Sequence, residues 1–436
     1  MLEGFQNASR IPELRRRLLF TFAMLAVYRV GVAIPTPGID GKALAAFFDQ
    51  VRDSVLGLVN LFSGGALEQF SIFALGIMPY ISSSIILQLM TVVVPHLERL
   101  SKEGEVGRRK ITQYTRYGTV VLSIIQSLFI SIGLEKIQAP GGAPVVYDPG
   151  WGFRVMTIIT LSSGTAFLMW LGEQISERGI GKGISLLIFA GIVANLPSAM
   201  VTTAQFVREG ELSILVLFAL AAFMILTIGV IIFVERGQRR IPVQYAKRVV
   251  GRRMYGGQSS HLPLKINTAG VIPPIFASSL LVFPATIASF VQHPWAEAAA
   301  QAMSPGSIIY NLVYIGLIIF FCYFYTAVSF NTGDVAENMK KFGGFIPGIR
   351  PGPRTAEYID RVLVRITLGG ALYIAAVCVL PTILVQRFNV PFYFGGTALL
   401  IVVGVALDTV AQLETHMLTR SYQGFMRRGR LRGRRG

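Results

Sequence analysis

The sequence predicts an all-α membrane protein that crosses the bilayer many times, and three observations support this fold class. Of 436 residues, 53% are hydrophobic and only 14% are charged, whereas soluble domains carry about 25% charged residues. Mean hydropathy is +0.57, and the formal net charge is +17. An apolar body with a basic periphery is typical of a polytopic helical protein, because backbone in lipid must satisfy its hydrogen bonds internally.

Ten stretches are long and apolar enough to span a bilayer as helices, which takes about 20 residues each. They are residues 18–34, 72–94, 117–134, 154–172, 184–203, 212–234, 268–291, 307–330, 366–386 and 392–412. The first contains Arg29, close enough to the end of the span for its side chain to reach the interface. No small-residue cleavage site follows the first span, so we do not expect a cleaved signal peptide.

Basic residues are unevenly divided between the two sides that these spans define. Segments on the side of the N-terminus hold 33 of the 40 Lys and Arg residues, and the opposite segments hold six. This excess predicts that both termini and the large basic loops 235–267 and 331–365 are cytoplasmic. Ten spans divide into five plus five, and repeats of odd length must be inverted in the membrane. The expected parts are residues 1–17 (cytoplasmic segment), 18–203 (N-terminal half), 212–412 (C-terminal half) and 413–436 (basic cytoplasmic tail).

Motifs of catalysis are absent from the sequence. It has no G-x-x-x-x-G-K-[ST], no H-E-x-x-H and no G-x-S-x-G, so we expect no enzymatic activity. Cys322 and Cys378 lie in apolar runs as small buried side chains, and the four histidines lack zinc spacing. We therefore expect no cofactor and no metal. The glycines of ERGIGKGIS (177–185) favour a tight hairpin turn over an anion nest.

The segment 60–70, NLFSGGALEQF, is apolar, interrupted by glycine and too short to span a bilayer. A full span beginning near Ser71 follows it, so we expect a short half-helix that dips into the membrane. Irregular backbone at that depth must be surrounded by protein or line a cavity, which predicts that the protein encloses one. An amphipathic helix on the outer surface is the alternative.

Three functions fit these features when only the residues are considered. They are a passive protein-conducting channel driven by a partner, an ion-coupled secondary transporter with inverted repeats, and a basic membrane receptor for ribosomes. A transporter usually needs carboxylates near the midplane, and Asp408 is the main candidate, although we expect it to be packed near the cytoplasmic end. The basic loops, which also carry aromatic residues, suit RNA phosphate or an acidic protein, and membrane topology together with anionic membrane lipid is the alternative explanation.

Seven stretches narrow this choice. They are FSGGALEQFSIFALGIMPYI (62–81), EGEVGRRKITQYTRYGT (103–119), MWLGEQISERGIGKGISLLIFAGI (169–192), FVERGQRR (233–240), HLPLKINTAGVIPPIFASS (261–279), FIPGIRPG (345–352) and VPFYFGGTALLIVV (390–403). Through them the chain resembles, over essentially its whole length, the SecY family, the central subunits of the bacterial SecYEG protein-conducting channel. One departure is Pro274, which follows Pro273 where the family pattern more often has a single proline.

The resemblance implies an hourglass pore between two inverted five-helix halves, closed at its waist by aliphatic side chains. The implied ring is Ile77, Ile81, Ile184, Ile188, Ile275 and Ile401. A saturated ring offers ions no replacement for their hydration. The implied plug beneath it includes Phe62, Ser63, Gly64, Gly65, Ala66 and Leu67. The second span and the span 268–291 would form a lateral gate lined by Ser82, Gln88 and Phe283.

The resemblance also implies an activity and partners. The chain would translocate unfolded secretory polypeptides across the bacterial cytoplasmic membrane, and would release membrane-protein segments laterally into lipid. The SecA motor or the ribosome would drive it, docking on Arg252, Arg253 and Arg350, since guanidinium pairs in two-pronged fashion with carboxylate or phosphate. SecE and SecG are the implied partner subunits, and signal peptides are further implied partners.

Overall fold

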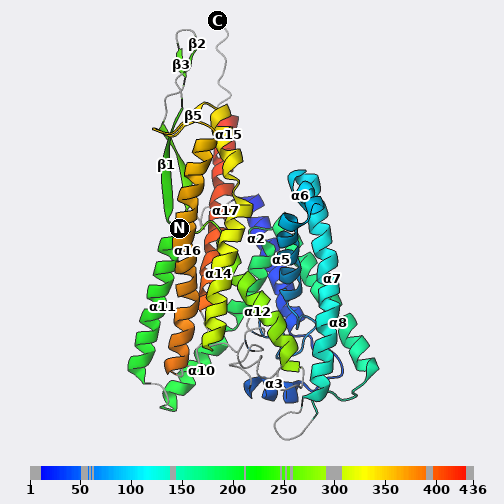
Figure 1. Ribbon diagram of the computed structural model, residues 1–436. Coiled ribbons are helices and arrows are strands. Elements are labelled where there is room, and N and C mark those ends of the chain that lie inside the picture. Colours follow the sequence, from blue (N-terminus) through cyan, green and yellow to red (C-terminus); the bar gives the residue numbers. More distant parts are fainter. Residues whose placement is uncertain are drawn as a thin grey trace. The chain divides into compact units, whose positions relative to one another are not determined.

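The computed structural model describes residues 11–50, 57, 60, 63–137, 144–210, 213–245, 248–250, 253–255, 259–290, 307–388 and 396–428, which are mostly helical (Figure 1). The chain forms two compact units. Unit 1 comprises Met1–Val201, Ser279–Pro305 and Val405–Gly436. Unit 2 comprises Thr202–Ser278 and Gly306–Gly404.

Unit 1 is a bundle of apolar helices. Its elements include α2 (Pro12–Val32), α3 (Gly41–Gln50), α5 (Met78–Val93), α6 (Pro95–Lys102), α7 (Glu105–Lys136), α8 (Trp151–Arg178), α9 (Gly183–Ala194) and the start of α10 (Leu196–Arg208), as far as Val201. Helix α7 packs along both α5 and α8, and α2 packs against α8 and α9. Helix α6 bends away from α5 by 99°. The bend follows from Pro95, which keeps Val94 extended at ψ 114° and so ends the preceding helix.

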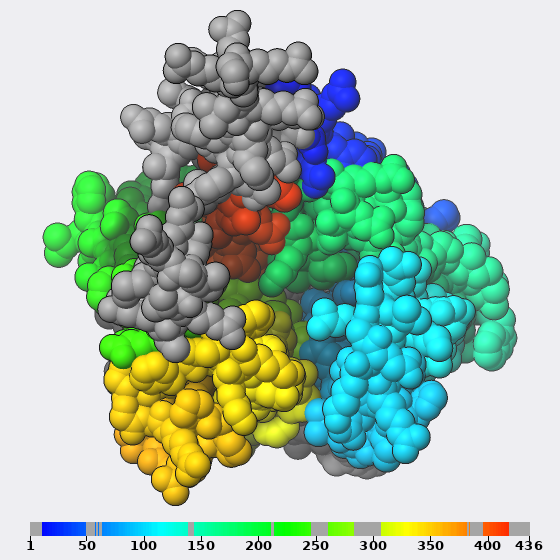
Figure 2. Space-filling model, turned by 90° about the horizontal axis from the view of Figure 1, so that it is seen from above, coloured from blue at the N-terminus to red at the C-terminus, as the bar shows by residue number. Residues whose placement is uncertain are grey.

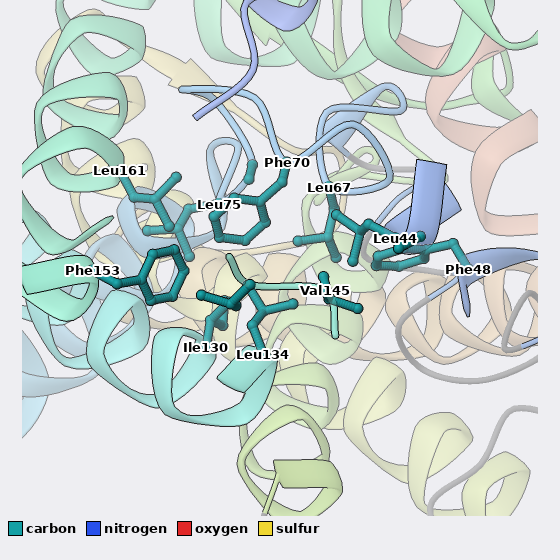
Figure 3. Close-up of a cluster of buried hydrophobic side chains, with 13 residues drawn as sticks. Leu44, Phe48, Leu67, Phe70, Leu75, Ile130, Leu134, Val145, Phe153 and Leu161 are labelled. Atoms are coloured by element: carbon teal, nitrogen blue, oxygen red, sulfur yellow. The ribbon is translucent and has the colours of Figure 1, made fainter. Parts of the chain in front are cut away.

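A buried hydrophobic cluster joins α3, α7 and α8 to the non-helical chain that precedes α5 (Figure 3). Leu44 and Leu161 in this cluster are fully buried. The cluster consists of Ala43, Leu44, Phe48, Leu67, Phe70, Ala74, Leu75, Ile130, Leu134, Val145, Val146, Phe153 and Leu161. It therefore ties the residues before α5 into the body of unit 1.

The buried face of α7 is polar but hydrogen-bonded. Thr119, Ser123, Ser127 and Ser131 recur every four residues and are fully buried. The Thr119 hydroxyl donates to the Thr115 carbonyl at 2.7 Å, and the Ser127 hydroxyl to the Ser123 carbonyl at 2.6 Å. Small side chains of this kind let membrane helices approach closely without leaving polar groups unpaired.

Unit 2 combines long helices with a small sheet. Its helices are α11 (Ile214–Glu235), the start of α12 (Ile272–Phe290), α14 (Ile308–Ser329), α15 (Thr332–Lys341), α16 (Pro353–Phe388) and the start of α17 (Gly396–Arg428). Helix α16 packs against α14 and α15. In Figure 1 the sheet strands β1 and β5 lie with α15 at one end of α16.

The sheet has the order β4-β1-β5 and is antiparallel throughout. Strand β1 (Gln238–Tyr245) pairs with β4 (Ser259–Lys265) in a register that places Ile241 opposite Leu262, and with β5 (Gly344–Phe345). Strands β2 (Arg248–Val250) and β3 (Arg253–Tyr255) form a separate hairpin. We call the β4-β1-β5 sheet, α15 and the start of α16 the basic cap. Its core is Ile241, Val243, Leu264, Met339, Ile346, Ile359 and Leu363.

The predicted fold class is confirmed. Among the described residues, seven helices are long and apolar enough to cross a membrane, or eight if the bent pair α5–α6 counts as one. Each of the ten predicted spans overlaps a helix. Two predicted spans overlap helices that are not among these eight, namely α2 and α12. Helix α2 carries four arginines, and the apolar stretch of α12 covers only Ile272–Val282. The predicted halves 18–203 and 212–412 stay a prediction.

Several predicted boundaries were wrong. Helix α5 begins at Met78 rather than near Ser71, because Gly76 has a positive φ of 56° and Pro79 lies in the first helical turn, where proline needs no N–H. Helix α16 begins at Pro353, within the predicted loop 331–365, because its first turns are amphipathic and hydropathy does not detect them.

The paired prolines do not disturb α12. The helix begins at Ile272, so Pro273 and Pro274 occupy its first turn. The N–H groups of that turn have no helical partner in any helix, so their loss costs no hydrogen bond. The departure from the family pattern is thus accommodated at the helix start.

Two glycines of α8 test how closely this helix packs against the backbone at Ile72. A Cβ at Gly164 would lie 1.9 Å from the Ile72 carbonyl oxygen, whereas a Cβ at Gly152 would meet nothing within 4 Å. We expect Gly164→Ala to destabilise the purified protein by about 1–3 kcal/mol, which is the usual cost of overpacking. Gly152→Ala should leave the thermal unfolding temperature unchanged or raise it, since alanine favours helix. Equal unfolding temperatures for the two variants would contradict the packing described.

Candidate functional site

The chain between Ser63 and α5 contains irregular backbone enclosed by unit 1. Residues 64–77 form turns, and Ala66 and Ser71 are fully buried. The Thr36 N–H donates to the Phe70 carbonyl at 2.8 Å, and the Ser71 N–H donates to the Ala66 carbonyl at 2.9 Å. These backbone groups are therefore paired within the protein although the segment is not helical, which is what irregular backbone inside a membrane protein requires. We call residues 63–77 the enclosed segment.

Helix α2 donates two hydrogen bonds to the start of the enclosed segment. The Tyr28 hydroxyl donates to the Ser63 carbonyl at 3.0 Å. The Arg29 guanidinium donates through Nη1 to the Gly64 carbonyl, also at 3.0 Å. Arg29 therefore has a specific partner in the backbone, and its reach to the interface stays a prediction.

The backbone of α9 also lies close to the start of the enclosed segment, at Gly64. Gly64 and Gly65 have φ of +70° and +86°, a region that side chains rarely adopt. A Cβ at Gly64 would lie 2.7 Å from the Gly191 Cα, whereas one at Gly65 would lie 3.7 Å from the nearest atom, Asn195 Oδ1. Only glycine at position 64 therefore allows this approach.

Asn60 closes the enclosed segment into a loop. Its side-chain amide donates to Glu68 Oε2 at 3.0 Å, and its side-chain oxygen accepts from the Glu68 N–H at 3.0 Å. The Gly65 N–H donates to the Asn60 carbonyl at 3.0 Å. The segment then continues into the hydrophobic cluster through Leu67 and Phe70, which are 4% and 1% exposed.

The structure brings together the predicted plug residues that it describes. Ser63, Gly64, Gly65, Ala66 and Leu67 are consecutive in the enclosed segment, and Phe62 lies outside the described residues. Residues 64–70 form turns, so the expected half-helix was wrong over this stretch. Their burial also contradicts the alternative of an amphipathic helix on the outer surface.

The six predicted ring residues are divided between the two units. Ile77, Ile81 and Ile188 in unit 1 are 6%, 6% and 3% exposed. Ile184 is half-buried, and its Cδ1 lies 2.7 Å from where a Cβ of Gly172 would be, so its side chain fills the space beside that α8 glycine. The remaining two, Ile275 and Ile401, are 7% and 0% exposed in unit 2. Their arrangement as one ring stays a prediction.

A contact between α5 and α12 falls where the lateral gate is predicted. The Ser279 hydroxyl donates to the Met78 sulfur at 3.8 Å, within unit 1. Of the predicted gate residues, Ser82 and Gln88 are half-buried on α5, and the side chain of Phe283 lies outside the description. Sequence reasoning missed Met78 and Ser279, although the small-residue run FASS (276–279) could have indicated a close helix contact.

The basic cap exposes arginine on a loop shaped by glycine. Arg350 is exposed between Gly348 and Gly352, whose φ values are +80° and +112°. The Arg350 carbonyl accepts from the Thr355 hydroxyl at 3.0 Å, which anchors the loop to α16. Other exposed cations of the cap include Arg239, Arg240, Lys265, Lys340, Lys341 and Arg354. Figure 2, which views the molecule from above, shows α15 and the start of α16 in yellow at the surface.

The other predicted docking residues are not placed. Arg253 belongs to β3, but its side chain lies outside the description, and Arg252 is outside the described residues altogether. Their role in docking stays a prediction.

The glycine-rich turn after α8 is stabilised by side chains. The Ile180 N–H donates to Thr21 Oγ1 at 3.1 Å, and the Gly181 N–H donates to Gln412 Oε1 at 3.0 Å. The Gly183 N–H donates to Ser176 Oγ at 2.9 Å. These amides already have acceptors, so the geometry favours the hairpin turn over an anion nest.

Asp408 is less buried than expected. Its side chain is 52% exposed, and its carboxylate lies 3.8 Å from Lys182 Nζ. The expectation of a packed carboxylate was wrong, since the Asp408 side chain is exposed and lies beside Lys182, the residue that precedes α9. An exposed pair of this kind contributes little to stability and is not a desolvated ion site.

Fold and site together define a class: a polytopic helical membrane protein with an enclosed irregular segment and an exposed basic cap. The family model for SecY matches residues 71–410. The chain is 53% identical over 434 residues to protein translocase subunit SecY of Escherichia coli K12, covering 98% of each chain. It is 46% identical over 429 residues to the Aquifex aeolicus protein of that name, covering 98% of this chain and all of the relative. The chain therefore belongs to the SecY family, as its sequence motifs predicted.

Solved structures agree on the fold. A protein-conducting channel matches with a TM-score of 0.67 at 17% identity, covering 93% of each chain. Sec61 in the canine ribosome-channel complex from the endoplasmic reticulum matches with a TM-score of 0.62 at 16% identity, with the same coverage. At these identities the agreement extends to the arrangement of helices.

The two neighbouring glycines of the enclosed segment give a matched test of the site. We expect Gly64→Ala to displace the segment from α9, since its Cβ would press on the Gly191 backbone. Gly65→Ala has the same φ strain but ordinary contact distances, so it controls for backbone strain. Hydrogen exchange read by mass spectrometry should accelerate in residues 63–71 of Gly64→Ala well beyond that of Gly65→Ala. Similar exchange in both variants would exclude the α9 contact as a constraint.

Proposed function

We propose that this chain is the channel subunit of a protein translocase of the bacterial cytoplasmic membrane. It would conduct unfolded secretory polypeptides across the membrane and release membrane-protein segments sideways into lipid. The enclosed segment carries the proposal, because irregular backbone held inside a helix bundle fits a removable stopper better than a static core. The 53% identity to a protein translocase subunit supports it.

The constriction is proposed to be the ring of six isoleucines named above. Such side chains make few specific contacts with a passing polar chain, since they carry no hydrogen-bonding groups. They also exclude hydrated ions at rest, because they cannot replace water around an ion. The burial of Ile77, Ile81 and Ile188 within unit 1 supports their part in this ring.

The lateral gate is proposed to open between α5 and α12. The Met78–Ser279 contact is long and weak, since a thioether is a poor acceptor. A seam held by such contacts separates at lower cost than one held by strong ion pairs. Signal peptides and membrane segments would leave through it.

The basic cap is proposed to dock the driving partner, which is SecA or the ribosome. Exposed arginines on a glycine-shaped loop suit both, because ribosomal RNA presents phosphate and protein motors present carboxylate. Similar structures include a canine channel and a yeast Ssh1 complex, each bound to a ribosome. SecE and SecG are proposed as the small subunits that complete the channel.

The energy for transport is proposed to come from the partner, and the chain itself to catalyse no reaction. Both termini are proposed to be cytoplasmic, on the strength of the 33 to six division of basic residues. The alternative of an ion-coupled transporter is not favoured, since Asp408 is half-exposed and paired with Lys182.

The proposed function is tested by protease protection of a secretory precursor. Proteoliposomes would contain this chain with its small partner subunit, with SecA and ATP present or omitted. Protected precursor only when both are present is the expected result. Absence of protection with verified assembly would contradict the channel and favour the transporter.

The same assay tests the docking role of Arg350. Arg350→Glu should reduce SecA-driven protection at least tenfold, because it replaces an exposed fork of donors with a repelling carboxylate. Lys42→Glu is the matched control, since it makes the same charge change at an exposed position on the predicted outer side. Normal precursor protection with Arg350→Glu would show that Arg350 has no role in docking.

A further inference from the structure

Arg29 occupies an unfavourable place in the first helix. The other arginines of α2 (Arg15, Arg16 and Arg17) cluster at its N-terminal end, on the proposed cytoplasmic side, whereas Arg29 lies one turn from its C-terminal end. A cation at this end of α2 works against the distribution of basic residues that sets topology. Such a residue needs a specific partner to be tolerated.

The partner is the backbone of the enclosed segment. Two consecutive residues of α2, Tyr28 and Arg29, donate to the carbonyls of two consecutive residues, Ser63 and Gly64, each at 3.0 Å. Ser63 is helical and Gly64 begins a turn with positive φ, so these carbonyls lie where a helix ends. Carbonyls at a helix end have no donor within the helix. The α2 side chains supply the donors that the helix lacks.

The two parts of the enclosed segment are held by different forces. Residues 63–65 are fixed by the two α2 donors and by contact with the Gly191 backbone. Leu67 and Phe70 are fixed by hydrophobic packing with α3, α7 and α8 (Figure 3), and the Thr36 N–H also donates to the Phe70 carbonyl. Hydrogen bonds to carbonyls can be exchanged for water or for other carbonyls, whereas buried leucine and phenylalanine lose their burial if they move.

We propose that Tyr28 and Arg29 form a latch that holds residues 63–65 in the resting channel, while Leu67 and Phe70 remain fixed as the anchor of the hinge. The hinge lies at Gly65 and Ala66, between the polar latch and the apolar anchor, so opening also breaks the two hydrogen bonds that join Asn60 to Glu68 and the one from the Leu67 N–H to Ser63 Oγ. Opening releases the Ser63 and Gly64 carbonyls, and the backbone carbonyls of an unfolded polypeptide then present the same acceptors to the freed donors. This inference rests on the proposed function for the meaning of opening.

The latch predicts a local change in hydrogen exchange. Tyr28→Phe removes one donor with little change of shape, and Arg29→Met removes the other at similar length. With both substitutions, exchange in residues 63–66 should accelerate roughly tenfold to a hundredfold, the range expected for hydrogen bonds that include a charged donor. Exchange in residues 70–75 should stay unchanged. Resting ion leak of proteoliposomes should rise in parallel, and Arg29→Lys should restore part of the protection.

Thr21→Ala is the matched control on the same helix. It removes a side chain that accepts from the Ile180 N–H, so it should loosen residues 179–183 and leave residues 63–66 unaffected. If the double variant fails to fold, Tyr28→Phe alone decides, since it retains the ring packed on Phe73. Unchanged exchange in residues 63–66, or acceleration spread over all of unit 1, would overturn the latch.

The experiments can refute the latch and the proposed function independently of each other. If the unmodified chain translocates precursor with SecA and ATP but the variants leave exchange and leak unchanged, the latch is wrong and the function stands. If the variants loosen residues 63–66 but the unmodified, assembled chain protects no precursor, the function is wrong and the α2 contact stands as a structural feature.

Discussion

Backbone at membrane depth must find its hydrogen-bond partners inside the protein, and the enclosed segment is where this chain meets that requirement. Three surrounding helices each present a glycine to it. A Cβ at Gly31 of α2 would lie 2.0 Å from the Phe73 ring, one at Gly164 of α8 would lie 1.9 Å from the Ile72 carbonyl, and one at Gly191 of α9 would lie 3.3 Å from Gly64. The bundle is thus shaped to admit a non-helical chain.

This arrangement reconciles stability with release. The apolar end of the segment shares a core with α3, α7 and α8, where many van der Waals contacts hold each large side chain. The other end depends on hydrogen bonds whose net contribution is smaller and which water can replace. A structure that is firmly anchored at one end and weakly held at the other suits a stopper that moves without unfolding the protein.

Much of the fold could be predicted from sequence, because hydropathy reports which stretches can lie in lipid. Boundaries failed where local chemistry decides them, as at Gly76 and Pro79 before α5. The amphipathic start of α16 was also missed, since it leaves the apolar stretch. The sheet in loop 235–267 was missed too, although the buried Ile241 and Val243 alternate with exposed residues and could have indicated a strand.

The site was predictable only in part. Family motifs led to residues 63–67, but their partners Tyr28 and Arg29 lie 35 residues earlier in the chain, and no sequence period connects the two places. The pairing of Asp408 with Lys182 was equally hidden, because the two residues are far apart in the sequence and meet only after folding. Contacts of this kind are set by tertiary packing and become visible only in the structure.

Thiol reactivity of the enclosed segment tests the account most directly. Single cysteines would be placed by Ser63→Cys and Ala74→Cys, after Cys322 and Cys378 are replaced by alanine, and probed with a membrane-impermeant maleimide. The account predicts that both sites are unreactive at rest, and that only position 63 reacts when SecA and ATP hold a precursor arrested in the channel. Reaction at position 63 at rest, or no change on arrest, would contradict an enclosed segment that opens for the substrate.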